Sequence, residues 1–135
     1  MTDGDKIRSY RDLKVWQRAM EAADKVLDMV ENGPLAQKYR LAGQIEASSA
    51  SVPANIAEGH ELGTRRQYLK HLYYARGSLA ETRTFLEMFQ KRNYFDAATA
   101  RAAWSDYNEV GKMLNTLITR LEQGMDDTDA PDPNT

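Results

Sequence analysis

Side chains that could support catalysis are few and poorly spaced in this sequence. His60 and His71 are the only histidines, and cysteine is absent. Glu58 and His60 are two residues apart, so on a helix they face different directions and are badly placed to share a metal ion. The serines around Ser48 lack the strand-turn-helix context of a hydrolase nucleophile, and no glycine motif for phosphates or dinucleotides is present. We therefore expect no enzyme, no metal site and no cofactor.

Basic and aromatic side chains offer a second kind of chemistry. Arg65, Arg66 and Lys70 cluster with Tyr74 where a helix is expected to begin. This mixture can contact phosphates and stack on bases, so these four residues form the candidate site for nucleic acid or for a protein partner. The alternative is an ordinary solvated face with Tyr73 packed against the protein, because positive charge at a helix N-terminus opposes the helix dipole.

Length, composition and charge place the chain among globular proteins of one domain. It has 135 residues, of which 41% are apolar and 28% charged, and no apolar run long enough for a membrane helix. A polar N-terminus argues against a secretory signal, so we expect a cytoplasmic protein. The formal net charge is −2, but the part from Lys6 to Arg120 carries 18 basic and 13 acidic residues, a net charge of +5. We expect a flexible lead (1–11), a bundle (12–121) and a disordered acidic tail (122–135).

The first predicted helix has more apolar surface than one face of a bundle needs. Asp12 is expected to cap it, and Asn32-Gly33-Pro34 ends it after Glu31. The stripe expected to face the core contains Leu13, Trp16, Met20, Ala23, Leu27 and Val30. A second stripe contains Val15, Ala19, Ala22, Val26 and Met29. We expect the second stripe to meet another subunit; the alternative is a central helix packed on two sides.

The segment from Ser51 to Gly59 places a proline inside a second helix that is expected to begin near Gln37. Pro53 removes a backbone donor and crowds the carbonyl of residue 49, at a cost of about 3 kcal/mol in a helix interior. Either the helix kinks, with Ser49 or Ser51 bonding the freed groups, or a new helix starts at Pro53. We expect the kink, because the apolar positions keep their register across the proline. Gly59 is expected to loosen the helix exit.

Two further helices follow. Thr64 is expected to cap the third, which runs to about Gln90, and Asp96 or Thr99 the fourth, which runs to Leu121. Gly77 in mid-helix costs roughly 1 kcal/mol relative to alanine, so we expect it at a close helix contact. The predicted core positions are Tyr68, Leu72, Ala75, Leu79, Leu86 and Phe89 in the third helix and Ala103, Tyr107, Val110, Leu114, Leu117 and Leu121 in the fourth. The predicted fold is all-α, an antiparallel up-and-down four-helix bundle with a proline-kinked second helix.

Several strings of this sequence resemble those of the 23S rRNA intervening-sequence proteins, a family that includes accessory proteins of diversity-generating retroelements. The matching strings are residues 12–17, 44–59, 75–81 and 113–121. The resemblance implies an antiparallel four-helix bundle that assembles as a homopentamer, and a retroelement branch that binds nucleic acid and partners a reverse transcriptase. The chain departs from the pattern at Glu46 and Ala47, where many members are basic. The motif residues expected to be structural are Pro53, Asn55, Glu58, Gly59, Gly77, Ser78 and Glu81.

Together these features predict a non-enzymatic, oligomeric binding or scaffold protein with RNA or DNA as its ligand, and the resemblance implies that the oligomer is a homopentamer. The alternative is a protein–protein adaptor that recruits a partner, such as a reverse transcriptase, without touching nucleic acid. No membrane association is expected.

Overall fold

The computed structural model describes residues 6–124, which contain four α-helices, two short 3₁₀ helices and no β-strand. The α-helices are α1 (Lys14–Glu31), α2 (Tyr39–Glu61), α3 (Arg65–Lys91) and α4 (Ala97–Glu122). The 3₁₀ helices are η2 (Tyr10–Asp12), before α1, and η3 (Pro34–Gln37), between α1 and α2. The predicted all-α fold with four helices is confirmed.

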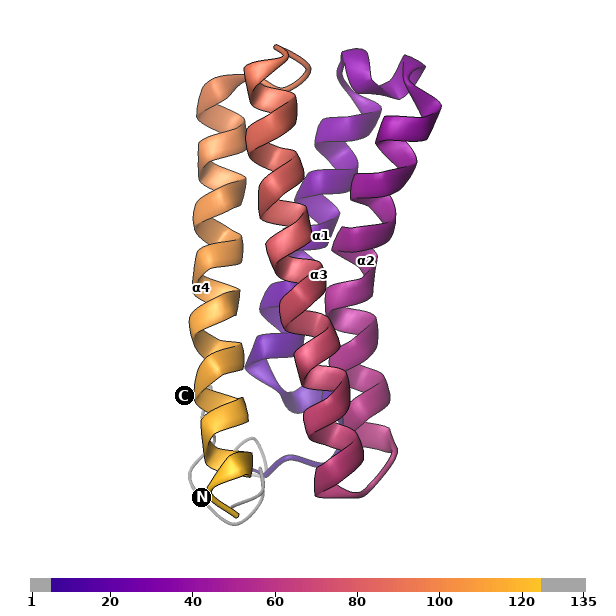
Figure 1. Ribbon diagram of the computed structural model, residues 1–135. Helices are drawn as coiled ribbons and strands as arrows, with labels where there is room; N and C mark the ends of the chain where they lie inside the picture. Colours follow the sequence, from indigo (N-terminus) through magenta and orange to yellow (C-terminus); the bar gives the residue numbers. More distant parts are fainter. Residues whose placement is uncertain (1–5, 125–135) are drawn as a thin grey trace.

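The four helices lie side by side in one bundle (Figure 1). The turns that join consecutive helices alternate between the two ends of the bundle. Consecutive helices contact each other, and α1 also contacts α4, so the helices close around a shared core. Within residues 6–124, no helix combines the length and the apolar character that crossing a lipid bilayer requires.

The core consists of the apolar stripes of α3 and α4 together with residues of α1 and α2. Ile45, Val52 and Ile56 of α2 are fully buried. All twelve predicted core positions of α3 and α4 are buried as well. Removing a leucine-sized side chain from water contributes about 1.5–3 kcal/mol, so this shared interior is the main source of the bundle's stability.

The orientation of α1 differs from the prediction. Val15, Ala19, Ala22 and Val26, expected to meet another subunit, are buried in the core of the chain itself. From the stripe predicted to face the core, Leu13, Ala23 and Val30 are buried as well, whereas Met20 is 45% exposed. The error arises because both stripes are apolar, and periodicity alone does not say which of two adjacent apolar faces turns inward. Residues of both stripes are thus buried, and the large apolar side chain that α1 leaves exposed, Met20, belongs to the first stripe.

The predicted helix caps are partly correct. Thr64 Oγ1 accepts from the backbone N–H of Gln67 at the start of α3, and the Asp96 carboxylate accepts from the N–H of Thr99 at the start of α4. Asp12 does not cap α1, whose first turn follows Leu13 without a side-chain cap. Its carboxylate instead accepts from the N–H groups of Arg8 and Ser9, just before η2, and these bonds lower the pKa of Asp12.

The second helix begins at Tyr39, slightly later than expected, because Pro34–Gln37 form the separate turn η3. It then runs without interruption through Pro53, so the alternative of a new helix starting at the proline is wrong. The kink itself stays a prediction. Of the predicted lead and tail, residues 1–5 and 125–135 lie outside the described residues, while Glu122 ends α4.

Candidate functional site

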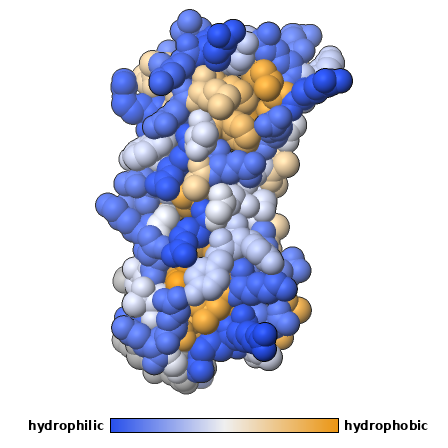
Figure 2. Space-filling view, viewed as in Figure 1, coloured by the Kyte–Doolittle hydropathy of each residue, from blue (hydrophilic) through white to orange (hydrophobic). Residues whose placement is uncertain are grey.

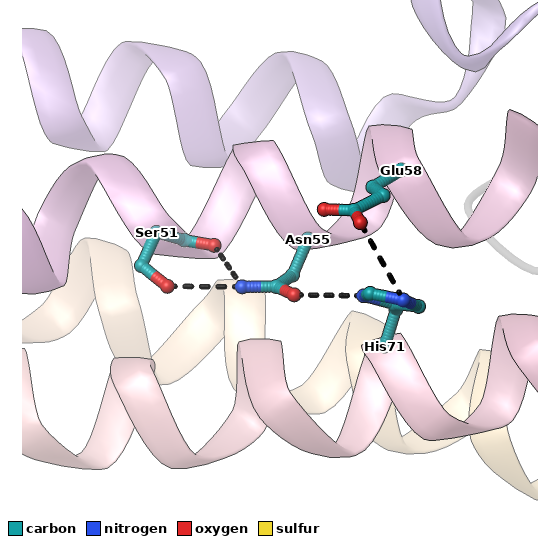
Figure 3. A network of polar contacts seen from close by, with 4 residues as sticks. All are labelled: Ser51, Asn55, Glu58 and His71. Atoms are coloured by element: carbon teal, nitrogen blue, oxygen red, sulfur yellow. Dashed lines mark hydrogen bonds and ion pairs between the residues drawn. The ribbon is translucent and has the colours of Figure 1, made fainter.

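Three residues of the Ser51–Gly59 segment converge on one side chain of α3, that of His71. Asn55 Oδ1 lies 3.0 Å from His71 Nδ1, and Glu58 Oε2 lies 3.7 Å from Nε2 (Figure 3). Asn55 Nδ2 donates to the Ser51 carbonyl and hydroxyl oxygens, both at 2.9 Å, so its Oδ1 must be the atom that faces the histidine. Because that oxygen can only accept, His71 carries a hydrogen on Nδ1 that it donates to Asn55.

Gly59 is the third member of this group, and it is required for steric reasons. A Cβ atom at Gly59 would lie 2.8 Å from His71 Cβ and 3.2 Å from the Tyr68 carbonyl oxygen. The expectation that Gly59 loosens the exit of the helix is therefore wrong, because α2 continues to Glu61 and Gly59 lets α3 approach closely.

Hydroxyl groups extend this contact along the two helices. Ser78 Oγ donates to Ser51 Oγ at 2.8 Å, and Thr82 Oγ1 donates to Ser48 Oγ at 2.8 Å. Ser48 and Thr82 are buried, and each also lies within hydrogen-bond distance of a backbone carbonyl of its own helix, that of Ile45 and Ser78 respectively. We call this set the polar seam; it comprises Ser48, Ser51, Asn55, His71, Ser78 and Thr82.

The family motif in α3, Gly-Ser-x-x-Glu (residues 77–81), has only one member in the contact with α2. Ser78 belongs to the seam, whereas Gly77 and Glu81 are exposed. A Cβ atom at Gly77 would meet nothing within 4 Å, so the predicted close helix contact at Gly77 is wrong. The glycine that allows close approach is the one at position 59.

Three of the four candidate binding residues come together at the start of α3. Arg66, Lys70 and Tyr74 line a groove of about 620 Å³, and Tyr73 lines it with them. Arg65 points elsewhere, because its Nη2 donates to the Gly124 carbonyl oxygen at 2.6 Å. The remaining lining residues of this basic–aromatic groove are Thr64, Gln67 and Leu69.

Tyr73 is the residue of this groove that the sequence did not assign to it. It is 39% exposed, and Tyr74 is 52% exposed. Arg66, Lys70 and Tyr73 follow one another at spacings of four and three, which on a helix places them on one face. That spacing is the sequence signal that could have assigned Tyr73 to the groove. A tyrosine next to core positions can equally be packed against the protein, and the sequence alone does not distinguish an exposed Tyr73 from a packed one.

Cations and a carboxylate hold the two tyrosine rings. The Lys70 ammonium lies 6.0 Å from the centre of the Tyr74 ring, and the Arg76 guanidinium lies 5.2 Å from that of Tyr73. The Tyr73 hydroxyl donates to the Glu122 carboxylate at the end of α4. This hydrogen bond, with some desolvation, raises the pKa of Tyr73, so the phenol stays neutral around pH 7.

A second groove lies between α1 and α2 and is mainly apolar. Its volume is about 570 Å³, and Met20 and Trp16 of α1 face Pro53 and Ala57 of α2 across it. The other lining residues are Tyr10, Glu21, Ala23, Asp24, Leu27, Ala50 and Ala54.

The side of the molecule seen in Figure 2 is mostly hydrophilic, with apolar residues exposed near its two ends.

Groups suited to metal binding do not assemble in the part of the chain that the structure describes. Among residues 6–124, no three His, Asp or Glu side chains lie where they could hold one metal ion. The buried Tyr107 hydroxyl has no hydrogen-bond partner within those residues, and burial raises its pKa, so it is a neutral core group.

Comparison with models of known protein families gives a match over most of the chain. The family model for the 23S rRNA-intervening sequence protein matches residues 11–116. This range includes α1, α2, α3 and most of α4, and with them the polar seam, the basic–aromatic groove and every lining residue of the α1–α2 groove except Tyr10. No curated protein matches the chain. From the matched range, which spans most of the sequence, we conclude that the chain belongs to the family of 23S rRNA-intervening sequence proteins.

Proposed function

We propose that this protein is a non-enzymatic, cytoplasmic homo-oligomer that binds RNA or DNA through the basic–aromatic groove. The observation that supports a nucleic-acid ligand is the composition of that groove. Arg66 and Lys70 stand beside two exposed tyrosines, and neither cation forms an ion pair with another residue of the range 6–124. Cations that have no ion-pair partner and lie next to accessible rings are suited to contact phosphates and unpaired bases.

The position of the charges adds to this argument. The first turn of α3 contains Arg65 and Arg66 and no acidic residue. Positive charge there is unfavourable, since the helix dipole prefers anions at its N-terminus. A residue that breaks a local rule without a structural gain is expected at functional sites. Arg65 has such a gain in its bond to Gly124, but Arg66 has none within the described residues.

Binding of labelled RNA and DNA, measured by fluorescence anisotropy at several salt concentrations, tests this function. We expect affinity to fall steeply with salt, because phosphate contacts release counterions. Replacing both Arg66 and Lys70 by Gln should weaken binding and reduce the slope of log K against log salt by roughly 1.4 for single strands. The control, Arg101→Gln with Lys112→Gln, removes the same charge from α4. Absent or salt-independent binding would contradict the proposal.

The oligomeric part of the proposal is supported by the apolar α1–α2 groove. Met20 exposes 45% of its surface there, among residues that are mostly apolar. Covering such a surface with a second copy would remove it from water. The number five is what membership of this family leads us to expect. Light scattering tests it, and a monomer at micromolar concentration would remove the oligomer from the proposal.

A second candidate is the protein–protein adaptor, and the same groove favours it. The groove carries Glu21 and Asp24 at its edge and no basic residue, so it suits a protein better than nucleic acid. Under this alternative, purified protein would bind a purified partner, such as a reverse transcriptase, and would not bind RNA or DNA. Met20→Lys should then abolish the partner contact, while the Arg66 and Lys70 variants should not affect it.

A further inference from the structure

The basic–aromatic groove has a shape that limits which nucleic acids can use it. All of its lining residues come from Thr64 and the first turns of α3, so it is an open shelf along one helix. The two tyrosines are adjacent in sequence, and about half of Tyr74 and over a third of Tyr73 remain exposed. A planar group of a ligand can therefore stack on the exposed rings of Tyr73 and Tyr74.

The rings are also held in place before any ligand arrives. Tyr74 meets the His71 ring edge to face, with ring centres 5.6 Å apart and planes at 89°. His71 is itself fixed by Asn55 across the polar seam, through the 3.0 Å contact at Nδ1. Tyr73 is tied by its hydroxyl to Glu122. Fixed aromatic rings lose little conformational freedom on binding, which favours stacking.

We propose that this groove binds single-stranded nucleic acid, with unpaired bases stacked on Tyr73 and Tyr74 and phosphates contacted by Arg66 and Lys70. The inference rests on the nucleic-acid function proposed above and names the form of the ligand. In a duplex the base faces are stacked on each other, so a protein reaches only base edges and phosphates. Exposed rings gain nothing from a duplex, but every unpaired base has a face that can stack.

The small number of cations supports the same choice. Only Arg66 and Lys70 of the lining residues are charged. Two phosphate contacts give a duplex little affinity, whereas a single strand adds stacking to them. The inference covers RNA and DNA strands alike, because base stacking does not involve the 2′-hydroxyl group.

The test compares a labelled single strand, as RNA and as DNA, with the blunt DNA duplex of the same sequence, by fluorescence anisotropy at low salt. We expect the single strands to bind at least about tenfold more tightly than the duplex. Tyr74→Ala should weaken single-strand binding by about tenfold and leave duplex binding unchanged. Arg66→Gln should weaken both. The matched control is Tyr39→Ala, which removes a tyrosine that is 78% exposed at the start of α2.

Tyr73→Phe provides a second check, because it keeps the ring and removes only the bond to Glu122. We expect it to retain most of the single-strand affinity that Tyr73→Ala loses, with circular dichroism confirming that each variant is folded. Equal affinity for strand and duplex, with no effect of Tyr74→Ala, would overturn the single-strand inference and leave the nucleic-acid function standing. No binding of any of the three probes would overturn both.

Discussion

The two sides of α2 are both built from small residues, yet they differ in what they do. Toward α3, the hydroxyl and amide groups of Ser48, Ser51 and Asn55 bond across the polar seam, and Gly59 allows close approach. Toward α1, the residues that line the groove have no polar side chain, as with Ala50, Pro53 and Ala57. The side of α2 that faces α3 is covered and makes specific hydrogen bonds, whereas the side that faces α1 lines an open groove without side-chain hydrogen bonds from the α2 lining residues.

This difference shows how one helix can serve packing and association at once. Buried hydrogen bonds are strong when every member is satisfied and costly when one is missing, so the seam favours a single register of α2 against α3. The open side carries no such requirement, because apolar surface can be covered by any partner of suitable shape. Variants on the two sides should therefore fail in different ways.

The largest expected effect is that of Gly59→Ala. The added Cβ would collide with His71 Cβ and approach the Tyr68 backbone, so we expect a loss of about 1–3 kcal/mol in the free energy of unfolding. Gly77→Ala is the matched control. It adds the same atom to α3 with nothing within 4 Å and should stabilise by about 0.5–1 kcal/mol. Urea unfolding measures both, and equal effects would show that the seam does not require close approach.

Asn55→Ala tests the polar members of the seam. It removes the bonds to Ser51 and leaves His71 Nδ1, on a side chain that is only 12% exposed, without its acceptor. We expect a loss of about 1–3 kcal/mol from the free energy of unfolding. Asn115→Ala removes one exposed bond, to Arg76, and should cost much less. If the two asparagine variants unfold at the same urea concentration, the seam is no stronger than a surface contact.

Met20→Lys tests the open side of α2 through the residue that faces it from α1. Because Met20 is already 45% exposed, we expect the free energy of unfolding to change by no more than about 0.5 kcal/mol. If a second copy covers the groove, the charge should instead dissociate the oligomer, as seen by light scattering. The control is Met88→Lys, which places the same charge at an equally exposed methionine of α3. Dissociation by both variants would mean that the α1–α2 groove is not the specific contact.

The smallest effect concerns a helix cap that belongs to neither side of α2. Bonds from the N–H and hydroxyl of Thr99 lower the pKa of Asp96 in the folded protein. A carboxyl group with a lowered folded pKa stabilises the protein above its unfolded pKa of about 3.9, and the stabilisation is lost as pH falls through the folded value. Asp96→Asn should therefore flatten the fall in the urea midpoint below about pH 4. An unchanged acid profile would show that the cap contributes nothing measurable.

The sequence was sufficient for the number of helices and for most of the core, because the stripes of α3 and α4 are each bordered by polar residues. It was not sufficient for α1, where two apolar stripes lie side by side and only packing decides which residues of each are buried. The close helix contact was predicted at Gly77 but lies at Gly59, for a similar reason. Close approach depends on what lies on the opposite helix, and for Gly59 that is His71.

The candidate site was predictable to a similar extent. The spacing placed Arg66, Lys70 and Tyr74 together, because helical neighbours three and four apart share a face. It also grouped Arg65 with them, because it does not reveal the bond from Arg65 to Gly124, which is 59 residues away along the chain. Likewise, nothing local indicates that Asn55 contacts His71, since the turn between α2 and α3 has to bring them together. Contacts between distant segments are the part that a single sequence does not contain.

The grooves also determine what the protein's own fluorescence can report. Of its two tryptophans, Trp16 lines the α1–α2 groove, and Trp104 lies against α3 with the Arg83 guanidinium 5.6 Å from its ring. The basic–aromatic groove contains tyrosines and no tryptophan. In a Trp104→Phe variant, the emission wavelength would follow the covering of Trp16 alone. Assembly and strand binding would thus give separate optical signals without any attached dye.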